Sequence, residues 1–317
     1  MGDKNATETL LADPAGIARA VEILRAGGLV AVPTETVYGL AARADSDQAV
    51  ARIYEAKGRP SFNPLIVHVR DAEQARFYAD FTGGASLLAE REWPGPLTLV
   101  VPLRPDAGLA EAVSAGLPTV ALRAPAHPVM RALLDLCGFP LAAPSANASG
   151  FISPTSADHV AASLNGRIDL ILDAGLCEEG LESTILAIRE DGGWDELRPG
   201  PVDLDALHWH YFDRPLQRGA GGDSIEAPGQ LASHYAPGKP VRLNVETAEA
   251  DEFHIGFGAI AGHCSLSASG SLSDAGANLY ACLHRAARSQ LPRIAVAPIP
   301  EIGIGNAIND RLRRSAA

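Results

Sequence analysis

The segment YEAKGRPSFNPLIVHV, residues 54–69, contains a lysine and an arginine two residues apart, Lys57 and Arg59. Only three of the 26 basic residues in the chain are lysines, so a lysine here is unusual. A lysine in the last helical turn followed by glycine is an ordinary helix end, in which the ammonium group faces the negative end of the helix dipole. A lysine beside an arginine can also neutralise the charges of a phosphate group. Taken alone, this segment favours the interpretation as a helix end, and a phosphate-binding role stays possible.

Two further polar segments follow apolar runs that are typical of buried strands: PTETVYGLAA, residues 33–42, and APSANASGFISPTS, residues 143–156. The hydroxyls of the first could satisfy backbone groups in a turn, and those of the second could cap a helix that begins near Ser156. Helix capping does not require Ser145 or Asn147, whose polar side chains could contact phosphate oxygens. Ligands of α/β proteins usually bind at such strand ends.

Several common catalytic motifs do not occur in the sequence. There is no GxxxxGK[ST] phosphate loop and no GxGxxG after a strand. There is no GxSxG motif, which makes Ser145 a poor candidate for a nucleophile. A nucleotide site in this chain would therefore be built from scattered basic and hydroxyl groups. No cluster of Asp and Glu with metal-site spacing stands out, so no metal ligands are predicted among the side chains.

The composition limits the class of protein. A chain of 317 residues with 47% hydrophobic content can bury a large core, and its net charge of −12 argues against coating nucleic acid by bulk electrostatics. The four cysteines are far apart without a CxxC pair, which predicts free thiols in a reducing compartment. No apolar run reaches 18 residues and the first residues lack an apolar signal region, so we expect a soluble cytoplasmic protein with no membrane partner.

The elements that must position these side chains alternate between strands and helices. Asp13 and Pro14 favour the start of a helix that ends at Gly27 and Gly28. Residues 34–40 are predicted as a loop. Apolar runs typical of buried strands occur at residues 29–33, 65–69, 97–103, 119–125, 140–145, 169–175 and 183–188, and further helices are predicted at 47–57, 127–137 and 156–164. This mixture predicts an α/β layered domain with a covered sheet.

The composition changes after about Pro201. Residues 214–240 are rich in Gly, Pro and Ser and lack periodicity, which is typical of a linker or extended arm. Beyond it, strands are predicted at 252–260 and 293–299 and helices at 275–289 and 304–317. We therefore predict a first domain over residues 14–205, a linker arm over 206–240 and a small α/β domain over 241–317.

Several motifs, in this order, carry a resemblance to a known family: PTETVYGL, KGRPSFNPLIVHV, TVALRAPAHP, APSANASGFISPT, ESTI and LRPG. They are similar to the YrdC-like domain. With APGQLASHYAPGKP and a chain end containing AINDRLRR, the sequence resembles the long, two-domain form of L-threonylcarbamoyladenylate synthase. The resemblance implies a twisted mixed sheet with flanking helices, joined by an extended linker to a small Rossmann-like α/β domain. The second domain is shorter than usual just after Pro240.

The resemblance implies a nucleotidyltransferase. Such an enzyme converts L-threonine, bicarbonate and ATP into L-threonylcarbamoyladenylate, pyrophosphate and water, the first step of threonylcarbamoyladenosine modification of tRNA. Attack at phosphorus depends on positioning and charge neutralisation, which suits a lysine and an arginine. Mg²⁺ is expected to accompany ATP. A downstream transferase complex would connect the product to tRNA.

The family motifs also imply a role for individual residues. The implied catalytic set is Lys57, Arg59, Ser145 and Asn147. The implied ATP-binding residues are Arg59, Asn63, Thr119, Ser145, Ser153, Arg198 and Tyr235, of which the last would reach back from the arm as part of a lid. The implied threonine-binding residues are Thr36, His68, Arg123, Ala143 (through its backbone) and Ser183.

The main alternative is an RNA-binding YrdC-like protein without synthase activity, since such a domain can present a concave basic surface. The net charge and an aromatic content of only 5% argue against it. Among enzymes, the closest alternative is a relative that handles another carbamoyl adenylate or an unrelated nucleotide, and the complete set of implied threonine-binding residues favours threonine.

Overall fold

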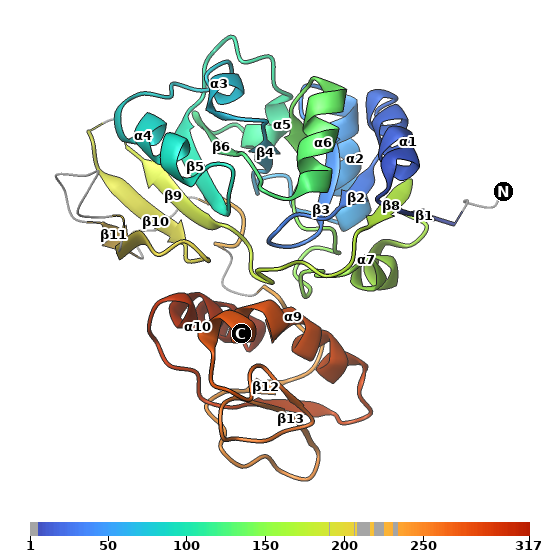
Figure 1. Ribbon diagram of the computed structural model, residues 1–317, viewed down its shortest axis with the longest axis vertical. Coiled ribbons are helices and arrows are strands. Elements are labelled where there is room, and N and C mark those ends of the chain that lie inside the picture. Colours follow the sequence, from blue (N-terminus) through green and yellow to red (C-terminus); the bar gives the residue numbers. More distant parts are fainter. Residues whose placement is uncertain (1–5, 190, 206, 208–215, 219–224, 231–233) are drawn as a thin grey trace.

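The protein was analysed as a computed structural model that describes residues 6–189, 191–205, 207, 216–218, 225–230 and 234–317. Eleven strands form one mixed sheet in the order β1-β8-β2-β3-β7-β4-β6-β5-β9-β10-β11 (Figure 1). These strands are β1 (Glu8–Leu11), β2 (Val30–Val32), β3 (Gly39–Arg43), β4 (Ile66–His68), β5 (Leu97–Pro102), β6 (Thr119–Arg123), β7 (Leu141–Ala142), β8 (Leu170–Asp173), β9 (Thr184–Ile188), β10 (Trp194–Arg198) and β11 (Gln217–Arg218). The helices that accompany them are α1 (Pro14–Arg25), α2 (Asp47–Lys57), α3 (Ala72–Ala75), α4 (Gly83–Glu92), α5 (Glu111–Ser114), α6 (Pro128–Cys137) and α7 (Ala157–Leu164).

Helix α2 begins and ends as its sequence predicts. The Ser46 side chain accepts a hydrogen bond from the Ala49 amide at its start. Lys57 is its last residue, and Gly58 follows in the left-handed conformation with φ 59°. A residue with a side chain would be strained there, so the glycine fixes where the chain leaves the helix. The helix-end interpretation of this segment is confirmed.

The sheet is covered on both faces, as the continuous apolar runs predict. On β2, Val30 and Val32 join an apolar cluster with α1 and α6, while Ala31 joins a larger cluster with α2, α4 and α7. On β4, Val67 belongs to the larger cluster, whereas Ile66 faces the opposite side. There it packs with Ala227 of the linker instead of a helix. Ala227 of the linker therefore covers part of the face on which α1 and α6 pack at β2.

Two differences from the sequence prediction have a physical reason. The predicted loop over 34–40 includes the start of β3, which pairs with β2 although its sequence GLAAR has no β-branched residue. Strand β1 is a short edge strand with mostly exposed side chains, so its apolar pattern is weak. The first sheet also takes in β11, which lies within the predicted arm.

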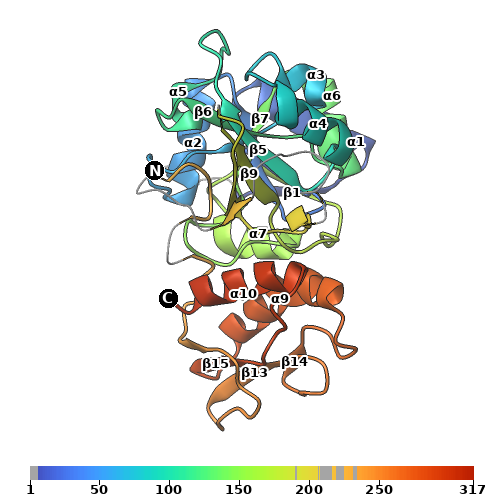
Figure 2. The same cartoon turned by 90° about the vertical axis from the view of Figure 1, so that its left-hand side faces the viewer.

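The last part of the chain forms a second sheet with all neighbours parallel, in the order β12-β15-β13-β14. Its elements are β12 (Val241–Arg242), β13 (Glu252–Gly256), β14 (Cys264–Ser265), α9 (Leu272–Arg288), β15 (Arg293–Val296) and α10 (Ile304–Ser315). Both helices lie between this sheet and the first domain, as Figure 2 shows. The implied fold, a large mixed sheet joined to a small parallel α/β domain, is confirmed.

The two domains are in close contact. Gly180 has φ 66°, and a Cβ at this position would lie 2.5 Å from backbone atoms of Ala277 in α9. Val37 and Leu181 of the first domain belong to the same buried apolar cluster as α9 and α10. The His159 and His284 rings stack across the interface with centroids 3.8 Å apart. The second domain is therefore docked directly against the polar segments that the sequence singled out.

The described residues contain no helix long and apolar enough to cross a membrane. Their four cysteines are free thiols and all are buried.

Candidate active site

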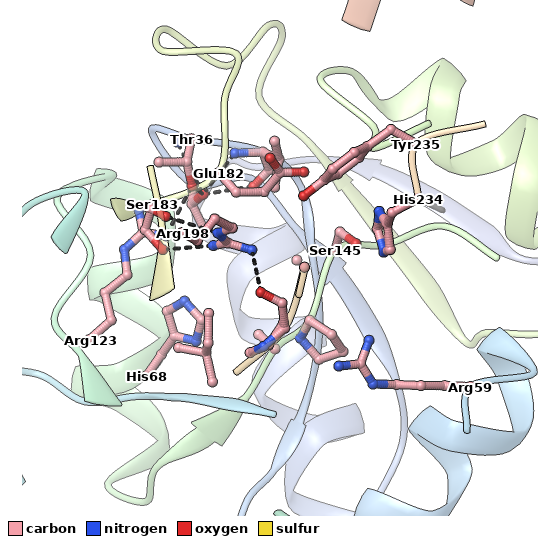
Figure 3. Close-up of a pocket in the computed structure, with 18 residues that line it drawn as sticks. Thr36, Arg59, His68, Arg123, Ser145, Glu182, Ser183, Arg198, His234 and Tyr235 are labelled. Atoms are coloured by element: carbon pink, nitrogen blue, oxygen red, sulfur yellow. Dashed lines mark hydrogen bonds between the residues drawn. The ribbon is translucent and has the colours of Figure 1, made fainter. Parts of the chain in front are cut away.

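A pocket opens where β3, β4, β6 and β10 meet the linker (Figure 3). Its space is about 540 Å³, including the part open to solvent. It is lined by Thr34, Thr36, Val37, Gly39, Arg59, Ile66, His68, Arg123, Ala143, Pro144, Ser145, Glu182, Ser183, Arg198, Pro228, Gly229, His234 and Tyr235. These residues come from distant parts of the chain, and nine of them belong to the set that the family motifs imply.

Arg123 ends β6 inside this pocket and has three partners. Its Nε donates to the Gly95 backbone oxygen at 3.1 Å, its Nη1 to Thr36 Oγ1 at 3.0 Å and its Nη2 to Glu35 Oε1 at 2.6 Å. Burial would raise the pKa of Glu35, but the charge and hydrogen bond of Arg123 outweigh it and hold that pKa below its ordinary value. Each terminal nitrogen of Arg123 keeps one further N–H, which together match a ligand carboxylate.

His68 ends β4 next to Arg123, with which it is paired in the strand register. Its Nδ1 is buried and has no hydrogen-bond partner among the residues that the structure describes. Burial, followed by the charge of Arg123, lowers the pKa of His68 to about 3. The imidazole is therefore neutral at physiological pH, and a buried nitrogen without a partner suits a polar ligand group.

Arg198 crosses the pocket floor to Ser183. Its Nε donates to the Ser183 backbone oxygen and its Nη2 to Ser183 Oγ, both at 3.1 Å. Its Nη1 lies 3.3 Å from the backbone oxygen of Pro228 in the linker. A Cβ at the neighbouring Gly229 would lie 2.9 Å from Arg198 Cδ and 3.2 Å from the Tyr235 hydroxyl. Glycine thus lets the linker lie flat against the arginine.

Arg59 reaches the pocket from the loop after α2. Its Nη2 donates to Asn63 Oδ1 at 2.6 Å and to the Pro64 backbone oxygen at 2.8 Å. Burial lowers the pKa of Arg59 to about 10, which leaves it charged at neutral pH. Asn63 therefore orients this guanidinium rather than lining the pocket itself.

Lys57 lies behind the pocket wall. Its Nζ lies 2.5 Å from the backbone oxygens of both Ser145 and Asn147 and 3.3 Å from Asn147 Oδ1. Its own carbonyl accepts from the Ser149 amide at 2.9 Å. Burial, then the charge of Arg59, holds the pKa of Lys57 well below its ordinary value. These contacts place Lys57 where it supports the loop that presents Ser145 to the pocket.

Three more implied residues lie outside the lining of this pocket in the described part of the chain. Asn147 donates from Nδ2 to the Phe151 backbone oxygen at 2.7 Å. Ser153 donates to Glu182 Oε1 at 2.5 Å. Thr119 begins β6, so it lies about 13 Å from Arg123 along that strand. The structure therefore brings together the implied threonine set and Arg59, Ser145, Arg198 and Tyr235. The implied residues outside the pocket lining are Lys57, Asn63, Thr119, Asn147 and Ser153.

The linker closes one side of the pocket with His234 and Tyr235. Tyr235 is buried and, although it is not glycine, has φ 63°. Its neighbour Ala236 donates from its amide to the Gly150 backbone oxygen at 2.9 Å. Burial lowers the pKa of His234 to about 3, so this ring is also neutral. A non-glycine residue held in this conformation is costly and indicates a constrained position.

The sequence prediction missed a carboxylate in the pocket, Glu182. It accepts hydrogen bonds from Ser153, Tyr280 and Arg311, the last two from the second domain. Burial would raise the pKa of Glu182, but Arg311 and the other partners lower it to about 2. Glu182 stands in the quoted motif ESTI, and the missed residues Glu35 and His234 stand in PTETVYGL and SHYAP. Only the position of these three residues within the motifs could have identified them as residues of the site.

Comparisons with known proteins show the family of this chain. The family model of the Sua5, YciO and YrdC proteins, described as Telomere recombination, matches residues 22–200, and the model described as Threonylcarbamoyl-AMP synthase, C-terminal domain, matches residues 206–317. The chain is a member of this family in its long, two-domain form.

Two relatives and two solved structures cover nearly all of the chain. A threonylcarbamoyl-AMP synthase of Bacillus subtilis is 38% identical over 98% of this chain and 95% of its own length, and one of Pyrococcus abyssi is 38% identical over 94% and 93%. The crystal structure of P. abyssi Sua5 complexed with L-threonine has a TM-score of 0.87 and 34% identity, covering 98% of this chain and 96% of its own. A double-alanine variant of the same protein has a TM-score of 0.88 at the same identity and coverage.

Proposed function

We propose that this chain is a threonylcarbamoyl-AMP synthase, which converts L-threonine, bicarbonate and ATP into L-threonylcarbamoyl-AMP, pyrophosphate and water. The observation that carries the proposal is a single pocket in which Arg123, with Thr36 and His68, faces Arg59, Arg198 and the linker. The names of its two full-length relatives support the reaction. The structure of P. abyssi Sua5 complexed with L-threonine, which is 34% identical in sequence, supports the amino-acid substrate.

The proposed reaction has two bond-forming steps. The threonine amine bonds to the carbon of bicarbonate and water leaves, which gives a carbamate. A carbamate oxygen then attacks the α-phosphorus of ATP, and the bond from that phosphorus to the pyrophosphate breaks. Both steps require two polar substrates held at a fixed distance, and the protein supplies this by positioning and by cationic groups rather than by a covalent nucleophile.

We assign the amino-acid end of the pocket to Arg123, whose two unused N–H groups suit the threonine carboxylate. The free Nδ1 of the neutral His68 and the hydroxyls of Thr36 and Ser183 suit its other polar groups. Arg59 and Arg198 suit the phosphates. Tyr235 and the linker would exclude water from an adenylate that water can hydrolyse.

We propose that Mg²⁺ enters as the Mg-ATP complex. No group of three or more His, Cys, Asp or Glu side chains in the described residues is arranged to hold a metal ion. The carboxylate that lines the pocket, Glu182, already accepts from three donors. A phosphate-bound Mg²⁺ with water ligands does not need a protein cage. The cytoplasmic location and the transfer of the product to tRNA by a downstream transferase complex remain predictions.

The experiment that tests the function is pyrophosphate release from Mg-ATP with each substrate omitted in turn. We expect release only when L-threonine and bicarbonate are both present. Release that is indifferent to threonine would contradict the proposal. Absence of release together with tight binding of RNA would favour the RNA-binding alternative instead.

A further inference from the structure

The pocket that we assign to ATP contains a carboxylate, which is an unfavourable group beside a triphosphate. Glu182 lines the pocket next to Ser183 and is about 6% exposed. In Figure 3 it lies beside Thr36 and Ser183, across from Tyr235. An unpaired negative charge buried here would repel the phosphates at close range, where screening by solvent is weak.

The arginine that hydrogen-bonds this carboxylate comes from the other domain. Arg311, in α10, donates from Nε to Glu182 Oε2 at 2.9 Å and has no exposed side-chain surface. Its Nη1 donates to Asp310 Oδ2 at 2.8 Å, and its guanidinium carbon lies 5.4 Å from the centroid of the Tyr235 ring. Tyr280, in α9, donates to the same Glu182 oxygen at 2.8 Å. One arginine of the second domain thus contacts both the pocket carboxylate and the linker tyrosine.

The domains also meet through contacts other than this ion pair. Leu181, Tyr235 and Val37 already share an apolar cluster with α9 and α10, and Gly180 packs against the backbone of Ala277. A buried ion pair often stabilises a fold no more than an apolar pair of similar volume, because both charges must leave water. The ion pair between Glu182 and Arg311 at the wall of the pocket can therefore have a role other than holding the two domains together.

The other oxygen of Glu182 contacts Ser153, a residue that the family motifs connect with ATP. Oε1 accepts from Ser153 Oγ, and the adjacent Ser183 accepts from Arg198 and shares a 2.8 Å hydrogen bond with Thr98. Holding the carboxylate therefore also holds two serines that the family motifs connect with ATP and threonine. Arg311 does not line the pocket, so it acts through Glu182.

We propose that Arg311 is a positioning residue of the synthase reaction, supplied by the C-terminal domain, which neutralises Glu182 so that this carboxylate does not repel the phosphates of ATP. The inference rests on the proposed function for its role in catalysis, but ATP binding tests it separately. The small domain then completes the nucleotide site electrostatically without contacting the nucleotide.

The test measures Mg-ATP affinity by calorimetry, with the Michaelis constants for ATP and L-threonine, on the full-length chain. Arg311→Gln should weaken ATP binding about tenfold or more, with a smaller change for threonine, because the buried carboxylate loses its counter-charge. Adding Glu182→Gln to Arg311→Gln should restore most of that affinity. Arg313→Gln, on the exposed side of the same helix, serves as the control and should match the wild type.

The outcomes separate the two proposals. The inference is wrong if Arg311→Gln leaves ATP affinity unchanged, or if Glu182→Gln does not restore it. If Arg311→Gln fails to fold, Arg311→Lys keeps the charge and should bind ATP within a few fold of the wild type. A folded Lys variant that loses about tenfold or more would contradict neutralisation. If no variant, including the wild type, makes the adenylate, the proposed function fails while the affinity pattern still decides the role of Arg311.

Discussion

The ammonium of Lys57 lies 2.5 Å from the backbone oxygen of Ser145, and this contact ties the end of α2 to the loop that lines the pocket. Since Lys57 also meets Asn147 through two oxygens, all three N–H bonds of the ammonium have acceptors. The rare lysine is thus satisfied by protein atoms, while Arg59, two residues later, faces the pocket.

We therefore predict that Lys57→Ala lowers both turnover and stability. From the sequence alone, a capping lysine would contribute only about 0.3–1 kcal/mol. The buried carbonyls left without a donor raise the expected loss to about 2–4 kcal/mol in the free energy of unfolding. Urea denaturation and pyrophosphate release measure the two effects.

Lys239→Ala is the matched control for this change, because the Lys239 ammonium also donates to two backbone oxygens, those of Ala286 and Ser289, in the second domain. It should lose stability but keep turnover at temperatures where it is folded. A Lys57→Ala protein with wild-type stability and no turnover would instead assign Lys57 directly to the chemistry.

A second prediction concerns the carboxylate of threonine. Arg123→Gln should raise the Michaelis constant for L-threonine on the order of 100-fold and leave that for ATP within a few fold, because a charge-assisted bidentate contact is removed from one substrate only. Steady-state kinetics with each substrate varied in turn measure the split. Equal losses for both substrates would argue that Arg123 maintains the pocket as a whole.

A third prediction concerns acid stability. Burial alone would raise the pKa of Glu182, but the charge of Arg311 lowers it. The resulting pKa is about 2, below the ordinary value near 4.5. A lowered pKa in the folded state means that this group stabilises the fold above pH 4.5 and that its contribution is lost as the pH falls toward 2. The difference amounts to about 3 kcal/mol. Thermal melts from pH 7 to pH 2 should therefore fall less steeply below pH 4.5 for Glu182→Gln than for the wild type. Parallel curves would contradict the assigned pKa.

A fourth prediction concerns domain docking. Gly180→Val should loosen the contact between the domains, because its Cβ would overlap the backbone of Ala277 as well as strain a positive φ. Gly166→Ala is the control, since it has φ 75° but no neighbouring atom within 4 Å of its Cβ. We expect faster hydrogen exchange in α9 and weaker ATP binding only for the first variant. Equal exchange in both would show that the contact tolerates the side chain.

The sequence predicted the parts of the site that each depend on one local motif. Lys57 and Gly58 end α2 as expected, and Arg123 and His68 stand at the ends of strands that the apolar runs located. Strand β3 was missed because its glycine and alanines pack by neighbour pairing rather than by intrinsic preference.

The partners of Glu182 could not be predicted in the same way. A carboxylate in a pocket that we assign to ATP has no local explanation, and its counter-charge stands 129 residues further along the chain. Likewise, the sequence could not indicate that Lys57 would point into the protein and Arg59 into the pocket. The position of Arg59 depends on the direction in which the chain leaves the left-handed Gly58.

The measurement that most directly tests the central claim, that one pocket joins threonine, bicarbonate and ATP, is mass spectrometry of the product formed with ¹³C-bicarbonate. We predict L-threonylcarbamoyl-AMP that carries the label in its carbamoyl carbon and forms together with pyrophosphate. Formation of AMP or ADP alone, with no labelled adenylate, would contradict the account.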